Sequence, residues 1–346
     1  MVNELTQKLE TEVIVNGLLS AIDREREQEI ISKRFGLFDR KETLEQIGES
    51  LGITRERVRQ LEKAVINKLK ASAENNQIPD IDELQSTLIK ALEDNGKVTR
   101  VFILSEKLTT ENSKLDQSRI AFIATLCPKL SMIDENDHFF QSVSITNPLS
   151  VASVKKKVGE LVSVIKDIGS PSKIEDIANK AGFEVDQSQG LATTSKDLAT
   201  LNGRWGLLKW PEVNPKNIRD KIYVILKESG KQMHFNEISD AIKSSDFKRK
   251  NVTTQAIHNE LIKDKRFVLI GRGIYALKEW GYKKGTVSEV ITDVLLKAGE
   301  PLHRDEIIKQ VLKSRHVKET TVLLNLQNKD KYKRVSKGTY TLLEQQ

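Results

Sequence analysis

The clearest alternation of apolar and polar positions lies between residues 43 and 70. It begins with apolar residues at helical spacing, namely Leu44, Ile47 and Leu51. Thr43, followed three residues later by Gln46, forms the pattern of a capping box, and Gly52 is typical of a helix C-terminus. A second helix is expected from residue 54 to about residue 70. A short helix, a glycine turn and a longer helix together predict a helix-turn-helix.

The second predicted helix has two distinct surfaces when its residues are placed at 100° intervals. The inward surface is apolar and consists of Val58, Leu61, Val65 and Leu69. The opposite surface is polar and consists of Glu56, Arg59, Gln60, Lys63 and Asn67, with Arg55 at the tip. Such a helix fits the major groove, where Arg pairs with guanine, Gln with adenine and Glu with cytosine. An ordinary solvated face is the alternative, although the like-charged Arg59 and Lys63 would repel each other on a free helix.

The rest of the chain contains a degenerate repeat. The segment GKQMHFNEISDAI (Gly230–Ile242) aligns without a gap with GEPLHRDEIIKQV (Gly299–Val311), and residues 251–277 align without a gap with residues 316–342. The second alignment pairs Val252 with Val317, Leu261 with Leu326, Phe267 with Tyr332, Gly273 with Gly338 and Tyr275 with Tyr340. Two more divergent copies precede these, around Gly96 and Gly169.

Each copy is predicted to contain three helices followed by two strands that form a hairpin, as Asn202-Gly203 indicates for the second copy. Three helices and a terminal hairpin describe a winged helix. The predicted fold class is therefore mainly α with small β-hairpin wings. We expect a helix-turn-helix domain followed by four winged-helix-like domains, over residues 1–72, 80–146, 151–213, 216–281 and 284–344. Candidate linkers that permit movement lie near residues 73–79, 147–152 and 212–215.

The charge of the chain is unevenly distributed. The formal net charge is +7, but counting Lys and Arg against Asp and Glu gives 0 for residues 1–70, −4 for residues 71–215 and +11 for residues 216–346. A basic C-terminal third favours a polyanion as partner, and nucleic acid is the commonest one. A lysine-rich surface that merely keeps the protein soluble is the alternative.

No residue pattern indicates catalysis. His234 and His303 recur at one repeat position with Glu three residues later, but a histidine that caps a helix explains this better than a metal site. The single cysteine, Cys127, is expected in the core. The G-x-x-x-x-G-K-[ST] phosphate loop is absent. We therefore expect no enzyme, no metal, no cofactor and no small-molecule substrate.

Three segments closely resemble region four of housekeeping bacterial sigma factors. They are DREREQEIISKRFGL (Asp23–Leu37), TLEQIGESLG (Thr43–Gly52) and ITRERVRQLEKAVINKLK (Ile53–Lys70), about one seventh of the chain. The resemblance implies that this helix-turn-helix reads a promoter −35 element and that the preceding helices contact the flap of the RNA polymerase β subunit. The aromatic, basic helix with which sigma factors melt the −10 element has no counterpart, so the protein is not expected to open promoters unaided.

Carried over by position, the resemblance implies a role for several groups of residues. The base readers would be Arg55, Glu56, Arg59 and Gln60. The phosphate contacts would be Thr43, Arg57 and Lys63. The apolar surface for the β flap would include Ile30, Ile31, Phe35 and Leu37, although some of these must belong to the core.

The last two copies resemble HARE-HTH domains, a module also found in the delta subunit of RNA polymerase from Gram-positive bacteria. The resemblance rests on the shared L/M-H-x-x-E-I motif and on the G-x-Y-x-L pattern of the hairpin. Cations at hairpin tips and before helices suit phosphate contact, and these are Arg272, Lys337, Lys248, Arg249 and Lys250. Protein binding is the alternative for these copies. The first two copies are acidic overall, which favours spacers or protein-binding domains.

Two functions are consistent with these features. The first is a sequence-specific DNA-binding regulator of bacterial transcription that reads a −35-like element in double-stranded DNA, with basic C-terminal domains adding affinity. The second is an RNA polymerase-associated accessory protein, delta-like or sigma-competing, that acts through protein contacts such as the β flap. The acidic, polar start MVNELTQKLE and the absence of a long apolar run predict a cytoplasmic, nucleoid-associated protein without membrane contact.

Overall fold

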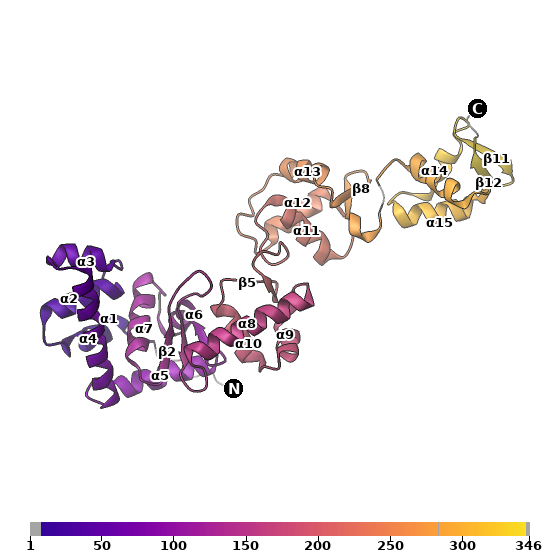
Figure 1. The fold of residues 1–346 in the computed structure, drawn as a ribbon. Coiled ribbons are helices and arrows are strands. Elements are labelled where there is room, and N and C mark those ends of the chain that lie inside the picture. The colour runs from indigo at the N-terminus through magenta and orange to yellow at the C-terminus, as the bar shows by residue number, and fades with distance from the viewer. Residues whose placement is uncertain (1–7, 283, 344–346) are drawn as a thin grey trace. The chain divides into compact units, whose positions relative to one another are not determined.

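The computed structural model describes residues 8–282 and 284–343 and shows a mostly helical protein with small antiparallel sheets. The chain divides after Lys209 into two compact units, and Figure 1 shows the helices and strands of each. The segment MVNELTQKLE, from which the localisation was predicted, lies largely in residues 1–7, outside the described part of the chain.

Four helices open the N-terminal unit. They are α1 (Thr11–Ser20), α2 (Glu25–Phe35), α3 (Leu44–Leu51) and α4 (Arg55–Glu74). The helix-turn-helix predicted from residues 43–70 corresponds to α3 and α4 and is confirmed. Helix α4 is four residues longer than expected because Ala73 packs into the core and the helix therefore continues past Lys70.

Four modules of one element order follow. The first has α5 (Ile81–Glu93), β1 (Val98–Arg100), α6 (Val101–Leu108), α7 (Lys114–Leu126), β2 (Leu130–Ile133) and β3 (Ser142–Ile145). The second has α8 (Val151–Ile168), β4 (Ser172–Lys173), α9 (Ile174–Ala181), α10 (Val185–Thr194), β5 (Leu198–Leu201) and β6 (Arg204–Leu207).

The third and fourth modules belong to the C-terminal unit. The third has α11 (Ile218–Ser229), β7 (Met233–His234), α12 (Phe235–Ser244), α13 (Thr254–Lys263), β8 (Phe267–Gly271) and β9 (Ile274–Leu277), followed by a short 3-10 helix, η1 (Lys278–Trp280). The fourth has α14 (Val287–Ala298), β10 (Leu302–His303), α15 (Arg304–Ser314), α16 (Glu319–Leu326), β11 (Tyr332–Ser336) and β12 (Thr339–Leu342).

The four sheets share one topology. In each, the last strand lies in the middle, between the second strand of the module and a short first strand, and all pairs are antiparallel. The short first strand was not predicted because its two or three residues are too few to show an alternating pattern. The identification of these modules as winged helices, and their likeness to HARE-HTH domains, remain predictions.

One hydrophobic core spans the predicted boundary between residues 72 and 80. Val65 and Leu69 of α4 share it with Leu88 of α5 and Phe122 of α7. The connection itself takes part, because Ile78 is 3% exposed and packs into the same core. The expected linker near residues 73–79 is therefore anchored in the core by Ala73 and Ile78, while residues 74–77 between them are exposed. Helices α1, α2 and α4 are thus supported by the first module.

The first and second modules also meet closely. Gly190 of α10 has no room for a side chain, because a Cβ there would lie 2.4 Å from the main-chain oxygens of Asn95 and Val98. The β2–β3 loop makes a second contact, in which Phe140 N donates to Thr194 O at 2.9 Å and Glu135 pairs with Lys196 at 2.7 Å. This loop, which contains the acidic segment of residues 134–137, therefore lies against the second module.

The third and fourth modules meet at the hairpin of the third. The main-chain oxygen of Ile270 in β8 accepts a hydrogen bond from His316 N at 3.2 Å. The neighbouring oxygen of Leu269 accepts from Arg315 Nη1 at 2.9 Å. The segment before α16 of the fourth module is thus held at the edge of β8.

Candidate nucleic-acid interface

The turn between α3 and α4 is defined by local hydrogen bonds. Thr43 Oγ1 accepts from Gln46 N at 3.3 Å and Gln46 Oε1 accepts from Thr43 N at 2.9 Å, which is the predicted capping box. Gly52 ends α3 with a φ of +64°, a conformation that costs glycine little. Thr54 then caps α4 through a hydrogen bond from Arg57 N to its Oγ1 at 3.2 Å. These caps fix the angle at which α4 leaves the turn.

A small apolar core positions the first half of α4. Ile30 of α2, Ile47 of α3 and Val58 of α4 are fully buried against one another. Leu44, Leu51, Ile53 and Leu61 pack around these three. The predicted inward surface of α4 is therefore confirmed, and the opposite surface of the helix faces solvent.

The predicted base readers lie together on that exposed surface. Arg55, Glu56, Arg59 and Gln60 are all exposed. The Arg59 guanidinium forms two hydrogen bonds with the Glu56 carboxylate, at 2.7 and 2.8 Å, and Gln60 Nε2 donates to Glu56 Oε1 at 3.4 Å. The Arg59 hydrogen bond lowers the pKa of Glu56 from its ordinary value. Both charges are therefore present at neutral pH, and Arg59 Nη1, which takes no part in the pair, can donate to a base edge while the pair stays closed.

The predicted phosphate contacts flank this surface. Thr43, Arg57 and Lys63 are exposed, as the prediction requires. Arg57 Nη1 donates to Gln60 Oε1 at 3.4 Å, which joins it to the same polar cluster. Thr43 lies at the N-terminus of α3, where unpaired main-chain N–H groups favour an anion.

The predicted flap-contact residues are not an exposed surface. Ile30, Ile31 and Leu37 are all 0% exposed. Phe35 is partly buried, with its ring centroid 5.0 Å from that of Phe122 in α7. The expectation that some of these four residues belong to the core is met by Ile30, Ile31 and Leu37, which lie in two cores, and contact of this segment with the β flap stays a prediction.

Arg119 of α7 is a structural residue that sequence reasoning missed. Its side chain is almost fully buried, Nε donates to Leu37 O at 2.8 Å, and Nη2 bonds to Glu12 Oε2 at 2.8 Å. It therefore ties the C-terminal end of α2 and helix α1 to the first module. The signal in the sequence was an arginine directly before the apolar run IAFIATL.

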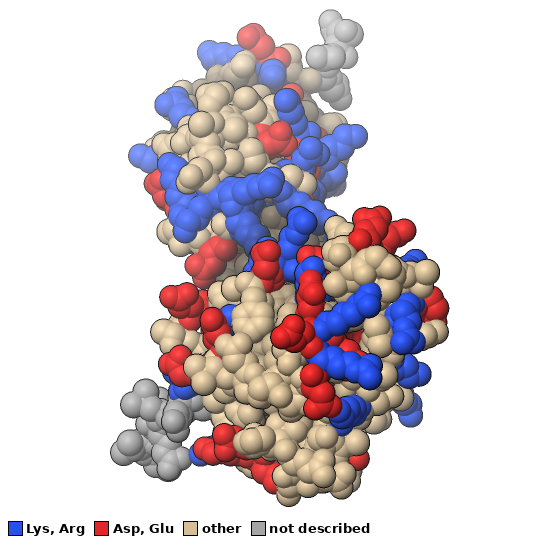
Figure 2. All heavy atoms as spheres, turned by 90° about the vertical axis from the view of Figure 1, so that its left-hand side faces the viewer, with Lys and Arg blue, Asp and Glu red and all other residues tan. Residues whose placement is uncertain are grey.

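The C-terminal unit carries exposed cations as well as cations that are bound within the protein. Lys248, Arg249, Lys250, Arg272 and Lys337, the predicted phosphate contacts, are all exposed. Lys250 Nζ donates to Ser245 O at 3.0 Å, which orders this part of the loop before α13. On the face shown in Figure 2, Lys and Arg side chains dominate the C-terminal unit, whereas acidic and basic groups are interspersed over the N-terminal unit. This distribution agrees with the charge of +11 carried by residues 216–346.

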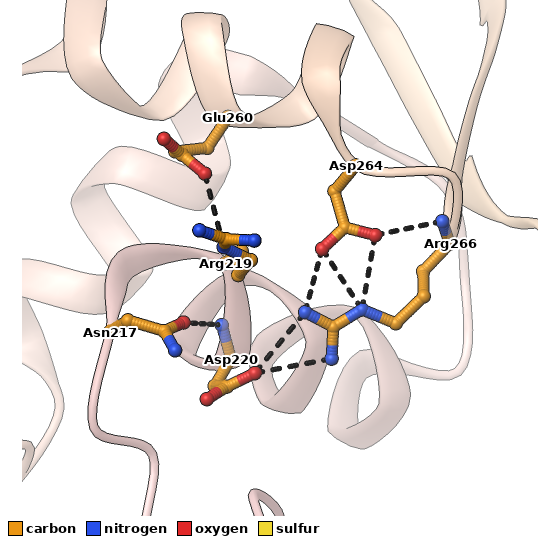
Figure 3. Close-up of polar contacts among 6 residues, drawn as sticks. All are labelled: Asn217, Arg219, Asp220, Glu260, Asp264 and Arg266. Carbon is orange, nitrogen blue, oxygen red and sulfur yellow. Dashed lines mark hydrogen bonds and ion pairs between the residues drawn. The ribbon is translucent and has the colours of Figure 1, made fainter.

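Other cations of this unit are bound within the protein. Arg266 bonds to Asp264 at 2.7 Å and to Asp220 at 3.1 Å, while Arg219 pairs with Glu260 at 3.3 Å (Figure 3). Burial raises the pKa of Asp264, but the hydrogen bonds from Arg266 outweigh it and lower the pKa overall. Arg266 therefore connects the start of α11 to the turn before β8 and is not available to a ligand in this arrangement.

Lys221 is a second residue that sequence reasoning missed. It is 4% exposed, and its Nζ donates to the main-chain oxygens of Lys248 and Arg249, each at 2.8 Å. Burial lowers its pKa, and the charge of Arg249 lowers it further. Because the carbonyls turn inward toward Lys221, the side chains of residues 248–250 project into solvent.

The two repeated histidines cap helices, as expected. Asn236 N donates to His234 Nδ1 at 3.3 Å, and Asp305 N donates to His303 Nδ1 at 3.4 Å. Cys127 is buried, and burial raises the pKa of its thiol to about 12. Over residues 8–282 and 284–343, no group of three His, Cys, Asp or Glu side chains is arranged to hold a metal ion. Within the same described ranges no helix has the length and apolar character to cross a membrane.

The helix-turn-helix is similar to known proteins. The family model described as Sigma-70, region 4 matches residues 24–71. The RNA polymerase sigma factor sigB of Arabidopsis thaliana is 48% identical over 54 residues, which are 15% of this chain and 9% of that protein. SigA of Listeria monocytogenes is 42% identical over 60 residues, 17% of this chain and 16% of SigA. RpoD of Helicobacter pylori is 53% identical over 49 residues, 14% of this chain and 7% of RpoD.

Residues 24–71 are therefore a sigma-70 region 4 domain. The matched part is a small share of each relative and of this chain, and the family match covers α2, α3 and most of α4. It implies a DNA-binding, transcription-related role for that part of the protein.

Proposed function

We propose that the protein is a sequence-specific DNA-binding regulator of bacterial transcription, without catalytic activity, whose helix α4 reads a promoter −35-like element. In this proposal Arg55, Glu56, Arg59 and Gln60 contact base edges. Thr43, Arg57 and Lys63 contact the backbone. The cations of the C-terminal unit add affinity that does not depend on sequence.

One observation carries the proposal. The region 4 match coincides with a capped helix on which four side chains with the right hydrogen-bonding groups stand exposed on one surface. Arg presents paired donors to guanine, Gln bonds to adenine, and Glu accepts from cytosine. A helix that only needed solvation would gain nothing from being supported by two separate cores. Packing of α4 against these two cores suits base reading, because base reading requires the side chains to be held in a fixed position relative to the base edges.

Fluorescence anisotropy with labelled duplexes tests the proposal. The wild-type chain is expected to bind a duplex carrying a −35 hexamer more tightly than a scrambled one. Arg59→Ala should cost about 1–3 kcal/mol on the −35 duplex and little on the scrambled one, because it removes base contacts. Lys70→Ala, an exposed cation near the other end of α4, is the matched control. Equal binding of the two duplexes by the wild type would refute base reading.

A second candidate is an RNA polymerase-associated accessory protein. The relatives named above are RNA polymerase sigma factors, and the first module is acidic, which favours protein contacts. Because Ile30, Ile31 and Leu37 are buried, such docking would have to use other residues, and the exposed Phe38 is the nearest large apolar side chain. Retention of the full chain on immobilised core polymerase, lost in Phe38→Ser, is expected on this view. No retention would reject it.

A further inference from the structure

The third and fourth modules carry the same hairpin in different surroundings. Their hairpins, residues 267–277 and 332–342, align without a gap. Both also have the same irregularity in register, between Leu269 and Gly271 in β8 and between Arg334 and Ser336 in β11. The two hairpins therefore share one backbone arrangement and differ in their side chains.

The hairpin of the third module is occupied by its own chain. The edge of β8 holds His316 and Arg315 through the main-chain oxygens of Ile270 and Leu269. One sheet face is apolar, and there Val268, Ile270 and Ala276 pack against the following residues Trp280 and Tyr282. This hairpin is thus an intramolecular docking surface, and Leu269 and the tip residue Arg272 remain exposed on it.

The hairpin of the fourth module has polar residues at two of the same three positions. Lys333 and Val335 replace Val268 and Ile270, and Thr341 replaces Ala276. Val335 is 55% exposed, and residues 333–337 are all exposed, so no described segment covers this strand. None of Lys333, Arg334 and Lys337 forms an ion pair within the described ranges. The result is an open, cationic hairpin.

We propose that the hairpin of the fourth module, residues 332–342, is the surface with which the C-terminal unit binds the backbone of a nucleic acid, and that the hairpin of the third module is not. This deepens the proposed function and rests on it only in requiring that the protein binds duplex DNA. Successive residues of a strand point to opposite faces, so Lys333 and Arg334 place charge on both sides of the hairpin. Phosphates on the two sides of a groove can then be contacted at once.

An acidic peptide strand is the competing partner, and the structure disfavours it. Lysine on an edge strand is a common means of preventing strand pairing. In the third module, where the equivalent edge does hold a protein segment, the aligned side chains are apolar. The change from Val268 and Leu269 to Lys333 and Arg334 therefore removes the features that suit a protein and adds those that suit phosphate.

Salt-dependent DNA binding tests the proposal. The variant K333Q/R334Q/K337Q is compared with K243Q/K309Q/K313Q, which removes three exposed cations elsewhere in the same unit. Near 0.1 M salt, the affinity of the hairpin variant for a scrambled duplex should be lower than that of the wild type by a factor of about ten or more. The slope of log K against log salt concentration should become shallower by about 2–3. The reason is that each phosphate no longer contacted by the protein keeps about one counterion that binding would otherwise release. The control variant should change the slope by less than about 1. The variant Arg272→Gln should leave the slope unchanged.

The outcomes separate this inference from the proposed function. If the wild type prefers the −35 duplex but the two triple variants lose affinity equally, the inference is wrong and the proposed function stands. If the hairpin variant alone loses affinity while the wild type shows no sequence preference, the inference stands and base reading fails. Binding of a labelled poly-glutamate peptide as tightly as DNA, abolished in the hairpin variant, would overturn the inference in favour of a protein partner. A melting temperature within a few degrees of wild type confirms that each variant is folded.

Discussion

At the scale of single residues, Arg119 has the largest structural role among the charged side chains of the N-terminal unit. It is buried, while its partner Glu12 remains 63% exposed at the side chain. The hydrogen bond to the main-chain oxygen of Leu37 therefore matters more than the ion pair, since an exposed ion pair contributes little. Removing the guanidinium leaves a buried carbonyl without a donor.

Arg119→Met is accordingly expected to lower the free energy of unfolding of the N-terminal unit by about 1–3 kcal/mol, the usual cost of a buried unsatisfied group. Glu12→Gln is the matched control and should cost less than about 1 kcal/mol. Urea unfolding of the full chain, followed by circular dichroism, measures both. An equal loss in the two variants would show that the ion pair, and not the carbonyl hydrogen bond, holds α2 to α7.

The residues that could be predicted are those whose partners are close in the sequence. Thr43 and Gln46 cap one helix turn, so their spacing alone revealed the contact. Phe35 and Phe122 are in contact although they are 87 positions apart in the sequence, and no local pattern in either segment indicates the other as its partner. For the same reason the sequence did not indicate which of the four candidate flap residues are core, because the core that covers Ile31 and Leu37 is completed by α5 and α7.

At the scale of elements, the loop before α13 depends on one side chain from α11. Lys221 supplies hydrogen bonds to two carbonyls, and Arg249 between them adopts a φ of +54°, which is unusual outside glycine. The loop is thus ordered although it carries three adjacent cations.

Lys221→Met should loosen this loop without a large change in global stability, because the loss of two hydrogen bonds and the removal of a buried charge oppose each other. Hydrogen exchange of the amides of residues 247–252 is expected to become faster, while the amides of α11 keep their protection. Lys265→Met, at an exposed position of the same module, serves as the control. Unchanged exchange in residues 247–252 would show that Lys221 does not order the loop.

Helices and hairpins were predicted better than the short first strands and the contacts between modules. The hairpin turn at Asn202-Gly203 could be expected because both residues adopt positive φ, at 50° and 73°, and Asn-Gly tolerates this. The burial of α7 had one indication, since residues 120–124 are apolar in every direction around the helix. Such a helix must be covered on all sides, but its sequence does not say by which elements.

At the scale of the whole molecule, the division after Lys209 predicts a specific pattern of proteolysis. Lys209 is exposed and is followed by Trp210, with which the second unit begins. The connection between α4 and α5 is exposed at residues 74–77 but is anchored by Ile78, which packs into the shared core.

Limited trypsin digestion should therefore cut at Lys209 before it cuts between residues 70 and 80. The fragments are expected to end and begin at Lys209 and Trp210, and mass spectrometry identifies them. In the variant Lys209→Gln the first cut should move to a neighbouring exposed cation, Arg204 or Lys216. An early cut after Lys70 would contradict the single core proposed for α4, α5 and α7.

The shared core also has a consequence for the order in which the protein becomes structured during synthesis. The reading helix α4 is complete when residue 74 has been made, but Phe122 and its neighbours in α7 follow about 50 residues later. At roughly 5–20 residues per second, the ribosome takes roughly 2–10 s to add them. During that interval Val65 and Leu69 have no partner in α7. Helix α4, which we propose to read DNA, therefore gains its full support only after α7 of the first module has emerged.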